Sequence, residues 1–376
     1  MQRALVMAGV LGVVISMLAP GGTGAASAAG PPGAVTEVSP LPQVVAVAVA
    51  DADAALRLVY WSRGPRGPMQ SSGAIYLPPG PPPPGGWPIV AYAHGTVGIA
   101  DHCAFSLQPR RLYLDTVYPE LLRAGYAVVL SDYVGLGTPG THPYLDGPSQ
   151  ARSVIDGVRA ARAVVPELSD RWAVLGQSQG GQTALFAARI APEDAPELRL
   201  RGAAATGPPS SLERIAPLLG PWVPRLPLRM TTAYVASILA GLRATAPELD
   251  VDGYLTPRGR HVLDVVENEC ATEADTLVRD ISIGELLAKP LGDPALLAAA
   301  HAMLRIPTEG HTVPLFIGQG LADLDVPAPL TAGLVAELTP AGADLQVAVY
   351  PGDHLATARD SLPDTLAFLH RVLDSP

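Results

Sequence analysis

The sequence has little positive charge. Of its 376 residues, 25 are lysine or arginine and 35 are aspartate or glutamate, which gives a formal net charge of -10. The single lysine is Lys289, and the arginines are scattered mostly singly along the chain. No basic face that could bind a phosphate backbone is therefore evident, and nucleic acid is not an expected partner.

Motifs for metals and nucleotide cofactors are also lacking. The chain has no H-E-x-x-H, no paired C-x-x-C and no EF-hand loop. Residues 135–140 match G-x-G-x-x-G, but Thr141, His142 and Pro143 follow where the helix of a dinucleotide-binding fold should begin. We therefore expect neither a cofactor nor a metal.

Cysteine is nearly absent, since Cys103 and Cys270 are the only two. An even pair in an exported chain more often forms a disulfide than a metal site, which would need further ligands at close spacing. We expect these two residues to be bonded. The bond would tie an early loop to a later insertion and stabilise the fold by roughly 2–4 kcal/mol.

One long apolar run is present, at the N-terminus. Met1, Gln2 and Arg3 precede an apolar run over 4–18 and a small-residue stretch over 21–29, which are the three parts of a secretory signal peptide. We expect cleavage after residue 28 or 29 and a secreted, extracellular protein. No second candidate for a transmembrane segment appears in the sequence.

Short apolar runs recur along the rest of the chain. Between them, apolar residues at helical spacing mark helices at 151–165 and 366–373. Strands that alternate with helices indicate an α/β fold with a mostly parallel, doubly wound sheet. The predicted strands lie at 73–77, 89–93, 127–130, 172–175, 202–205, 314–317 and 345–349, and we expect those from 89–93 onward to be buried on both faces.

The interval 208–307 interrupts this alternation. It lacks a strong strand signal and contains helical stretches separated by prolines. We expect a helical cap, or lid, inserted into a hydrolase core made of 30–207 and 308–376. The cap should cover the site described next.

The most informative motif is the stretch 176–181, Gly-Gln-Ser-Gln-Gly-Gly. It follows the apolar run 172–175 and precedes a small-residue helix, which is the context of a nucleophile elbow. Glycines two positions before and after the serine leave room for the sharp turn. Ser178 is therefore the expected nucleophile.

A serine nucleophile of this kind needs an acid and then a histidine later in the chain, each in a loop after a strand. Asp323 follows the strand 314–317, and Asp325 is its rival two positions on. His354 follows the strand 345–349 and has the required order for the general base. We predict Ser178, Asp323 and His354 as the catalytic residues.

The oxyanion hole requires two N–H donors. The strand 89–93 ends in a His-Gly pair, and the geometry of an elbow fold favours the backbone N–H of the next residue, Thr96. Gln179, directly after the nucleophile, should supply the second N–H. We expect His94 only to pack beneath the turn.

Taken together, the motifs resemble the secretory lipase family, the fungal and bacterial group typified by Candida lipase A. The stretches that carry the resemblance are 93–96, 103–106, 131–140, 142–144 and 176–181. The resemblance implies an α/β-hydrolase fold with a helical lid, triacylglycerol or simpler ester substrates and a disulfide between Cys103 and Cys270. Gln177 and Phe105 depart from the usual histidine and proline, which leaves substrate preference open.

Other functions remain possible. An exported aminopeptidase or acyltransferase on the same fold would need a carboxylate cluster in the cap, for which Glu248, Asp250 and Asp252 are candidates. A non-catalytic secreted binding protein is a third hypothesis, against which the serine, acid and histidine argue. The expected partner is a small-molecule ester or lipid, with transient contact with a lipid interface possible and no obligate protein partner.

Overall fold

The structure, a computed structural model, describes residues 29–42, 52–108 and 114–374, so nearly all of the predicted signal peptide, 1–29, lies outside it. Its centre is a nine-stranded sheet in the order β1-β2-β3-β5-β4-β6-β7-β8-β9. β1 to β3 are antiparallel to their neighbours, and β5, β4, β6, β7, β8 and β9 are parallel. The strands are β1 Val35–Pro40, β2 Ala54–Gly64, β3 Gly67–Leu77, β4 Trp87–Ala93, β5 Ala127–Val134, β6 Leu168–Gln177, β7 Arg199–Thr206, β8 Leu315–Gly320 and β9 Leu345–Tyr350.

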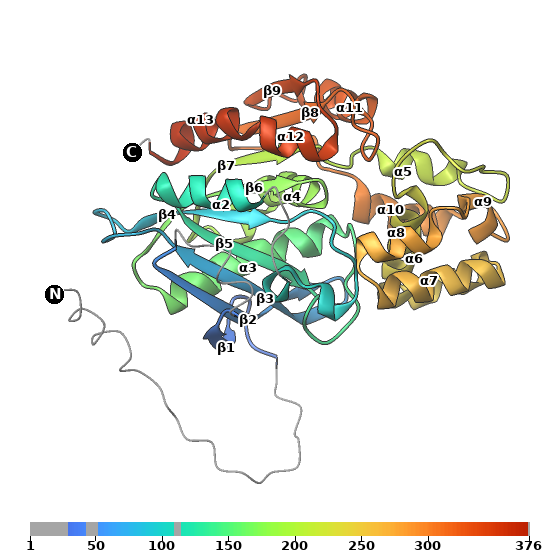
Figure 1. Cartoon of the computed structure of the whole chain (residues 1–376), viewed down its shortest axis with the longest axis horizontal. Coiled ribbons are helices and arrows are strands. Elements are labelled where there is room, and N and C mark those ends of the chain that lie inside the picture. Colours follow the sequence, from blue (N-terminus) through green and yellow to red (C-terminus); the bar gives the residue numbers. More distant parts are fainter. Residues whose placement is uncertain (1–28, 43–51, 109–113, 375–376) are drawn as a thin grey trace, which may run out of the picture.

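Helices cover both faces of the sheet. Alternate residues of β4 belong to two different hydrophobic clusters, Ile89 and Ala91 to one and Val90 and Tyr92 to the other. The first cluster also contains residues of α3, α4 and α11, and the second contains residues of α2 and α13, which Figure 1 shows across the sheet from α3. The helices of the core are α2 Leu114–Arg123, α3 Gly147–Val164, α4 Gln179–Asp194, α11 Ala328–Leu338, α12 His354–Asp360 and α13 Leu362–Leu373.

This architecture confirms the predicted α/β fold, with two differences at the edges of the sheet. Every predicted strand is present, but β1 and β2 were not predicted. The expectation of burial on both faces is wrong for β9, where Val347 is 43% and Val349 is 62% exposed. β9 is the last strand of the sheet and has a neighbour, β8, on one side only.

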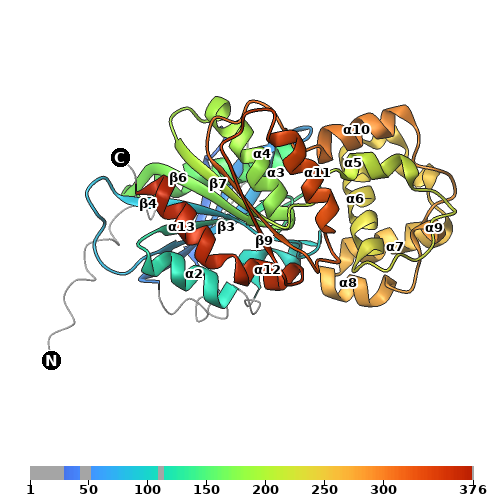
Figure 2. The same cartoon turned by 90° about the horizontal axis from the view of Figure 1, so that it is seen from above.

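Between β7 and β8 the chain is helical. These helices share a third hydrophobic cluster and gather at one end of the sheet in both views (Figures 1 and 2). They fall within the interval 208–307 predicted as a cap, and the division into core and cap domains stays a prediction. The helices are α5 Leu212–Ile215, α6 Thr231–Thr245, α7 Pro257–Asn268, α8 Ala271–Val278, α9 Ile283–Leu286 and α10 Pro294–Leu304.

Across the described ranges, every helix is too short or too polar to span a bilayer.

Candidate active site

Ser178 occupies a sharp turn between β6 and α4. Its φ of 55° and ψ of -121° are unusual for a residue with a side chain, and its N–H donates to the Thr206 carbonyl at 2.8 Å. A Cβ on Gly176 would lie 1.9 Å from the Gly180 carbonyl oxygen, and a Cβ on Gly180 would lie 1.8 Å from that of Ala93. Both flanking positions therefore require glycine, as the elbow motif predicts.

Asp323 and His354 meet beside the ends of β8 and β9. The Nδ1–H of His354 donates to Oδ2 of Asp323 at 2.6 Å. Both side chains are buried, and Gly207, at the end of β7, is so close that a Cβ there would lie 2.9 Å from His354 Cε1. The loops after three neighbouring strands thus enclose the acid and the base.

Backbone donors hold the Asp323 carboxylate in place. Its Oδ1 accepts from the N–H groups of Asp325 at 2.9 Å and Val326 at 2.7 Å, and Gln319 Nε2 donates to Oδ2 at 3.4 Å. With three donors besides the imidazole, the orientation of this carboxylate is fixed before any substrate binds.

His354 and Ser178 line one cavity of about 900 Å³. Since Nδ1 carries the proton donated to Asp323, Nε2 is the basic nitrogen of the neutral ring. Nε2 is buried and has no hydrogen-bond partner among the described residues. The structure therefore joins His354 to Asp323 directly and brings Ser178 and His354 to the same cavity, without a hydrogen bond between them.

Asp325, the rival acid, also lines this cavity but does not bond His354. Its Oδ1 accepts from the Tyr234 hydroxyl on α6 at 3.2 Å. Burial raises the pKa of this carboxyl, and the nearby His354 opposes the shift. Of the two candidate acids, Asp323 is thus the one that bonds the imidazole of His354, whereas Asp325 bonds Tyr234.

Of the two predicted oxyanion donors, one lines the cavity of Ser178 and the other follows Ser178 directly in the chain. Thr96 lines the cavity, and Gln179 is the first residue of α4, where a backbone N–H has no partner within the helix. The Thr96 hydroxyl bonds the Tyr144 hydroxyl at 2.7 Å. His94 is buried, donates from Nδ1 to the Gly95 carbonyl at 2.7 Å and stacks on Phe105, so it packs beneath the turn as expected.

Sequence reasoning missed a buried polar cluster under the elbow. His142 donates from Nδ1 to the Val134 carbonyl at 3.0 Å, and its Nε2 accepts from Gln179 Nε2 at 2.9 Å. Gln179 also donates to Gln150 Oε1. Burial lowers the pKa of His142 to about 4, so the ring stays neutral and can hold the first residue of α4. Sequence reasoning assigned His142 no role in this cluster: it served there only to exclude a dinucleotide-binding helix and, with 143–144, as part of the family resemblance.

Two spaces of different chemistry meet at Ser178. The first is the 900 Å³ space, which we name the polar cavity because five charged residues line part of it, Arg225, Arg229, Asp275, Arg279 and Asp325. Apolar residues line it as well, among them Val97, Phe105, Leu226, Leu228 and Met230. The second, the apolar pocket, measures about 310 Å³ and is lined largely by the cap. Its lining includes Leu212, Ile215, Leu219, Val235, Ile238, Leu239, Leu242, Leu291, Leu296 and Leu304.

The acidic residues proposed for an amine-binding cap site lie elsewhere. Glu248, Asp250 and Asp252 line neither space. Asp252 instead pairs with Arg243 at 3.2 Å. The carboxylate that the cap does bring to the polar cavity is Asp275, which sequence reasoning did not single out.

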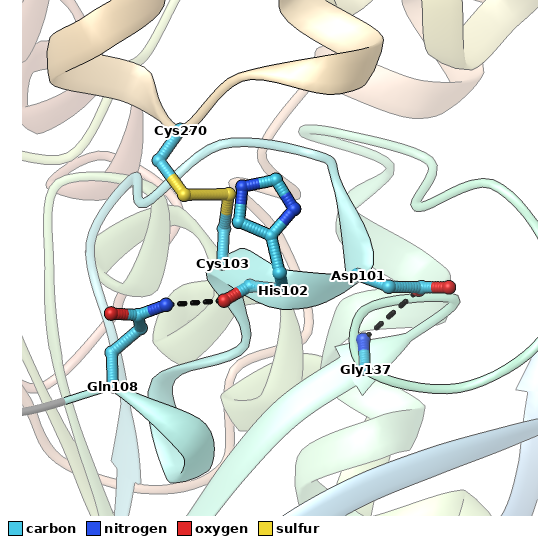
Figure 3. The surroundings of a disulfide bond; sticks show 6 residues. All are labelled: Asp101, His102, Cys103, Gln108, Gly137 and Cys270. Carbon is cyan, nitrogen blue, oxygen red and sulfur yellow. Dashed lines mark hydrogen bonds between the residues drawn. A yellow bond between two sulfur atoms is a disulfide. The ribbon is translucent and has the colours of Figure 1, made fainter.

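A disulfide joins Cys103 to Cys270, as predicted (Figure 3). Cys103 ends the short helix η2 Asp101–Cys103 of the core, and Cys270 is the N-cap of α8 in the cap. His102 lies beside the bond, and with the two sulfurs it is the one group of potential metal ligands found within the described ranges. The disulfide occupies both sulfurs, so they are not thiolate ligands.

The chain is similar in sequence and in fold to known lipases and esterases. The model of the "Secretory lipase" family matches residues 112–288. Lipase A of Moesziomyces aphidis is 24% identical over 276 residues, which are 67% of this chain but only 55% of that protein. The chain thus spans about half of the length of this curated relative.

Solved structures share the fold. Candida antarctica lipase A superposes with a TM-score of 0.77 at 20% identity, over 92% of this chain and 83% of that one. The rice cell wall degrading esterase LipA from Xanthomonas oryzae gives 0.69 at 19% identity, over 92% and 99%. The resemblance to the secretory lipase family is therefore confirmed, by a family model over nearly half of the chain and by an α/β-hydrolase fold over almost all of it.

Proposed function

We propose that this protein is a serine hydrolase that cleaves carboxylic esters through an acyl-enzyme intermediate. The observation that carries the proposal is the buried His354, which lines the same cavity as Ser178 and whose Nδ1 is bound to Asp323 while its Nε2 has no hydrogen-bond partner among the described residues. An imidazole held in this way can accept the proton of a serine hydroxyl. The names of the lipase and esterase relatives point to the same chemistry.

The reaction begins when Ser178 Oγ attacks the ester carbonyl and His354 Nε2 takes its proton. Asp323 stabilises the imidazolium, and the backbone N–H groups of Thr96 and Gln179 stabilise the oxyanion. The imidazolium then protonates the leaving alcohol. In the second half, His354 takes a proton from water, which attacks the acyl-enzyme and releases the carboxylic acid.

The apolar pocket supports an aliphatic acyl group. It opens beside Ser178, and apart from Asp325 its lining carries no charge. A buried methylene contributes about 0.8 kcal/mol of transfer free energy, so a pocket of this kind favours an alkyl chain over a polar acid. A triacylglycerol lipase or a related esterase fits this lining, and the N-terminal sequence supports secretion.

Single substitutions test the assignment of the catalytic residues. Ser178→Ala should abolish turnover of p-nitrophenyl octanoate and labelling by a fluorophosphonate probe in a protein that still folds. Asp323→Asn should lower kcat by about 10⁴-fold, because an amide at this place favours the wrong histidine tautomer, whereas Asp325→Asn should retain the larger part of kcat.

Circular dichroism and the melting temperature would establish that each variant is folded. Ester turnover by folded Ser178→Ala would refute the nucleophile. If Asp325→Asn were the inactive variant and Asp323→Asn the active one, the acid would be misassigned.

A further inference from the structure

The two spaces at Ser178 differ enough in chemistry to suggest which half of an ester each receives. The apolar pocket suits the acyl chain, and the polar cavity is left for the alcohol. Besides its charged residues, the polar cavity is lined by the hydroxyl-bearing residues Thr231, Thr232 and Thr272. A hydroxyl group of the alcohol can exchange hydrogen bonds with a lining of this kind, which a hydrocarbon cannot do.

Asp325 stands where the two spaces meet, since it lines both of them together with Ser178. Its carboxylate is half-buried and accepts one hydrogen bond from the described residues, that of Tyr234 at 3.2 Å. A carboxylate offers about four lone pairs, so most of its accepting capacity is unused. Asp323, in contrast, has four donors around it.

The charges around Asp325 favour a neutral hydroxyl over an ammonium group as the donor. Arg229 and His354 lie close enough to influence the Asp325 carboxyl, as do Asp323 and the phenols of Tyr234 and Tyr144. Arg225 and Arg279 line the same cavity. With Asp275 and Asp325 as the carboxylates that line this cavity, the three guanidinium groups leave an excess of positive charge. That excess disfavours a cation, whereas a neutral hydroxyl can donate to the Asp325 carboxylate without that cost.

We propose that the polar cavity binds the alcohol half of an ester that keeps a free hydroxyl group, as in a monoacylglycerol, and that Asp325 accepts the hydrogen bond of that hydroxyl. This inference rests on the proposed ester hydrolysis and narrows its substrate class to partially acylated polyols. Such an acceptor discriminates between alcohols, because an analogue without the hydroxyl leaves the Asp325 carboxylate with Tyr234 as its one donor among the described residues.

Two esters with the same acyl chain test the proposal. Glycerol monooctanoate carries free hydroxyls and propyl octanoate has none, and the readout is the ratio of their kcat/KM values below the solubility limit of each. We expect a ratio of about 10 or more for the unmodified protein, and about a 10-fold fall of this ratio in Asp325→Ala. Asp325→Asn keeps one carbonyl acceptor, so the ratio should fall by roughly threefold.

A matched control is Asp252→Ala, because Asp252 lies outside both spaces and forms an ion pair with Arg243. This variant should keep the ratio of the unmodified protein. If Asp325→Ala does not fold, the ratio measured for the isosteric Asp325→Asn tests the proposal in its place. An equal loss with both esters would overturn the proposal, because Asp325 would then act through His354 and not on the alcohol.

A ratio near 1 in the unmodified protein would also overturn it. Failure of the proposed function itself has a different signature. In that case the folded protein would hydrolyse neither of the two esters nor p-nitrophenyl octanoate, and no fluorophosphonate would attach to Ser178.

Discussion

At the scale of single residues, the turn at Ser178 depends on two glycines whose hydrogen atoms face backbone. A Cβ on Gly176 would lie 1.9 Å from a carbonyl oxygen, a contact that only a shift of the main chain can relieve. Backbone shifts in a packed site cost more free energy than the rotation of a flexible side chain. Position 176 therefore requires glycine for the packing of the backbone as well as for the turn at Ser178.

Gly176→Ala should lower the free energy of unfolding by about 2–4 kcal/mol and reduce ester turnover, because the elbow must open to accept the methyl group. Chemical denaturation measures the first effect and a p-nitrophenyl ester assay the second. Gly292 is a suitable control, since a Cβ there meets nothing within 4 Å. Gly292→Ala should change stability by less than about 0.5 kcal/mol. Equal stability of the two variants would contradict the steric argument.

His142 should make stability depend on pH. Its pKa falls from 6.5 in the unfolded chain to about 4 in the folded protein. Between these values the unfolded chain binds more protons, so stability falls as the pH drops from about 6.5 to 4, by an amount of order 3 kcal/mol. The buried His94 shifts in the same direction. Urea unfolding at several pH values should show a smaller slope for His142→Gln than for the unmodified protein, and identical slopes would contradict this account.

The elbow motif 176–181 predicted Ser178, and chain order then predicted Asp323 and His354, because the fold fixes the order in which such groups follow their strands. The hydrogen bond between His142 and Gln179 could not be predicted from a motif or from chain order. These two residues are 37 positions apart, and only the packing of the loop before α3 against the start of α4 brings them together. Asp275 was not predicted as a site residue either. An acidic residue on a cap helix is usually solvated, and the sequence does not show that this one lines a cavity.

At the scale of elements, α6 forms a wall of the apolar pocket with one face. Val235, Ile238, Leu239 and Leu242 line the pocket, and Ala233 and Ala240 lie on the opposite face in the hydrophobic cluster of the cap. Leu239 and Leu242 are buried in that cluster as well, whereas Val235 and Ile238 are half-buried and only pack against it. Substitutions at Val235 or Ile238 should therefore alter the space for the substrate with less effect on the packing of the cap.

Ile238→Trp should shift the acyl-chain preference toward shorter chains, because the indole would fill part of the 310 Å³ pocket. The measurement is kcat/KM for p-nitrophenyl esters from acetate to palmitate, with at least a 10-fold loss expected for the longest chains. Leu277→Trp is the control, since Leu277 is 60% exposed on α8 and lines neither space. An unchanged chain-length profile in Ile238→Trp would place the acyl chain elsewhere.

The buried strands were predictable because each is a continuous apolar run covered on both faces. β1 and β2 lacked this signal, since β1 is largely exposed and β2 mixes polar with apolar residues. Such strands are defined by their pairing with a neighbour rather than by burial, and pairing is not visible in a single sequence. β9 combined an apolar run with an exposed position, which periodicity does not distinguish from a central strand.

At the scale of the whole molecule, a disulfide links the helices between β7 and β8 to the loop after β4, beside the polar cavity. The disulfide spans 167 residues, and the residue after Cys270 lines that cavity. The sequence predicted the pairing, since only two cysteines exist. The sequence also predicted that the cap covers the site of Ser178, but not which core segments the cap contacts, because those segments are distant from it in the chain.

Replacing both Cys103 and Cys270 with serine should lower the free energy of unfolding by about 2–5 kcal/mol, mainly because the unfolded chain gains freedom when a long loop is no longer closed. Thermal unfolding of the double variant measures this loss. The unmodified protein under reducing conditions should melt at a temperature close to that of the variant. A melting temperature unaffected by either treatment would contradict a stabilising role.

The exposed edge of the sheet has a consequence for handling the protein. β9 ends the sheet with Val347 and Val349 at the surface and with one row of backbone groups unpaired by any other strand of the sheet. Such an edge is a template on which a second molecule can add a strand. We therefore expect concentrated solutions of the protein to aggregate through this strand. Val349→Lys should reduce that aggregation, because a charged side chain on an edge strand opposes the pairing of two molecules.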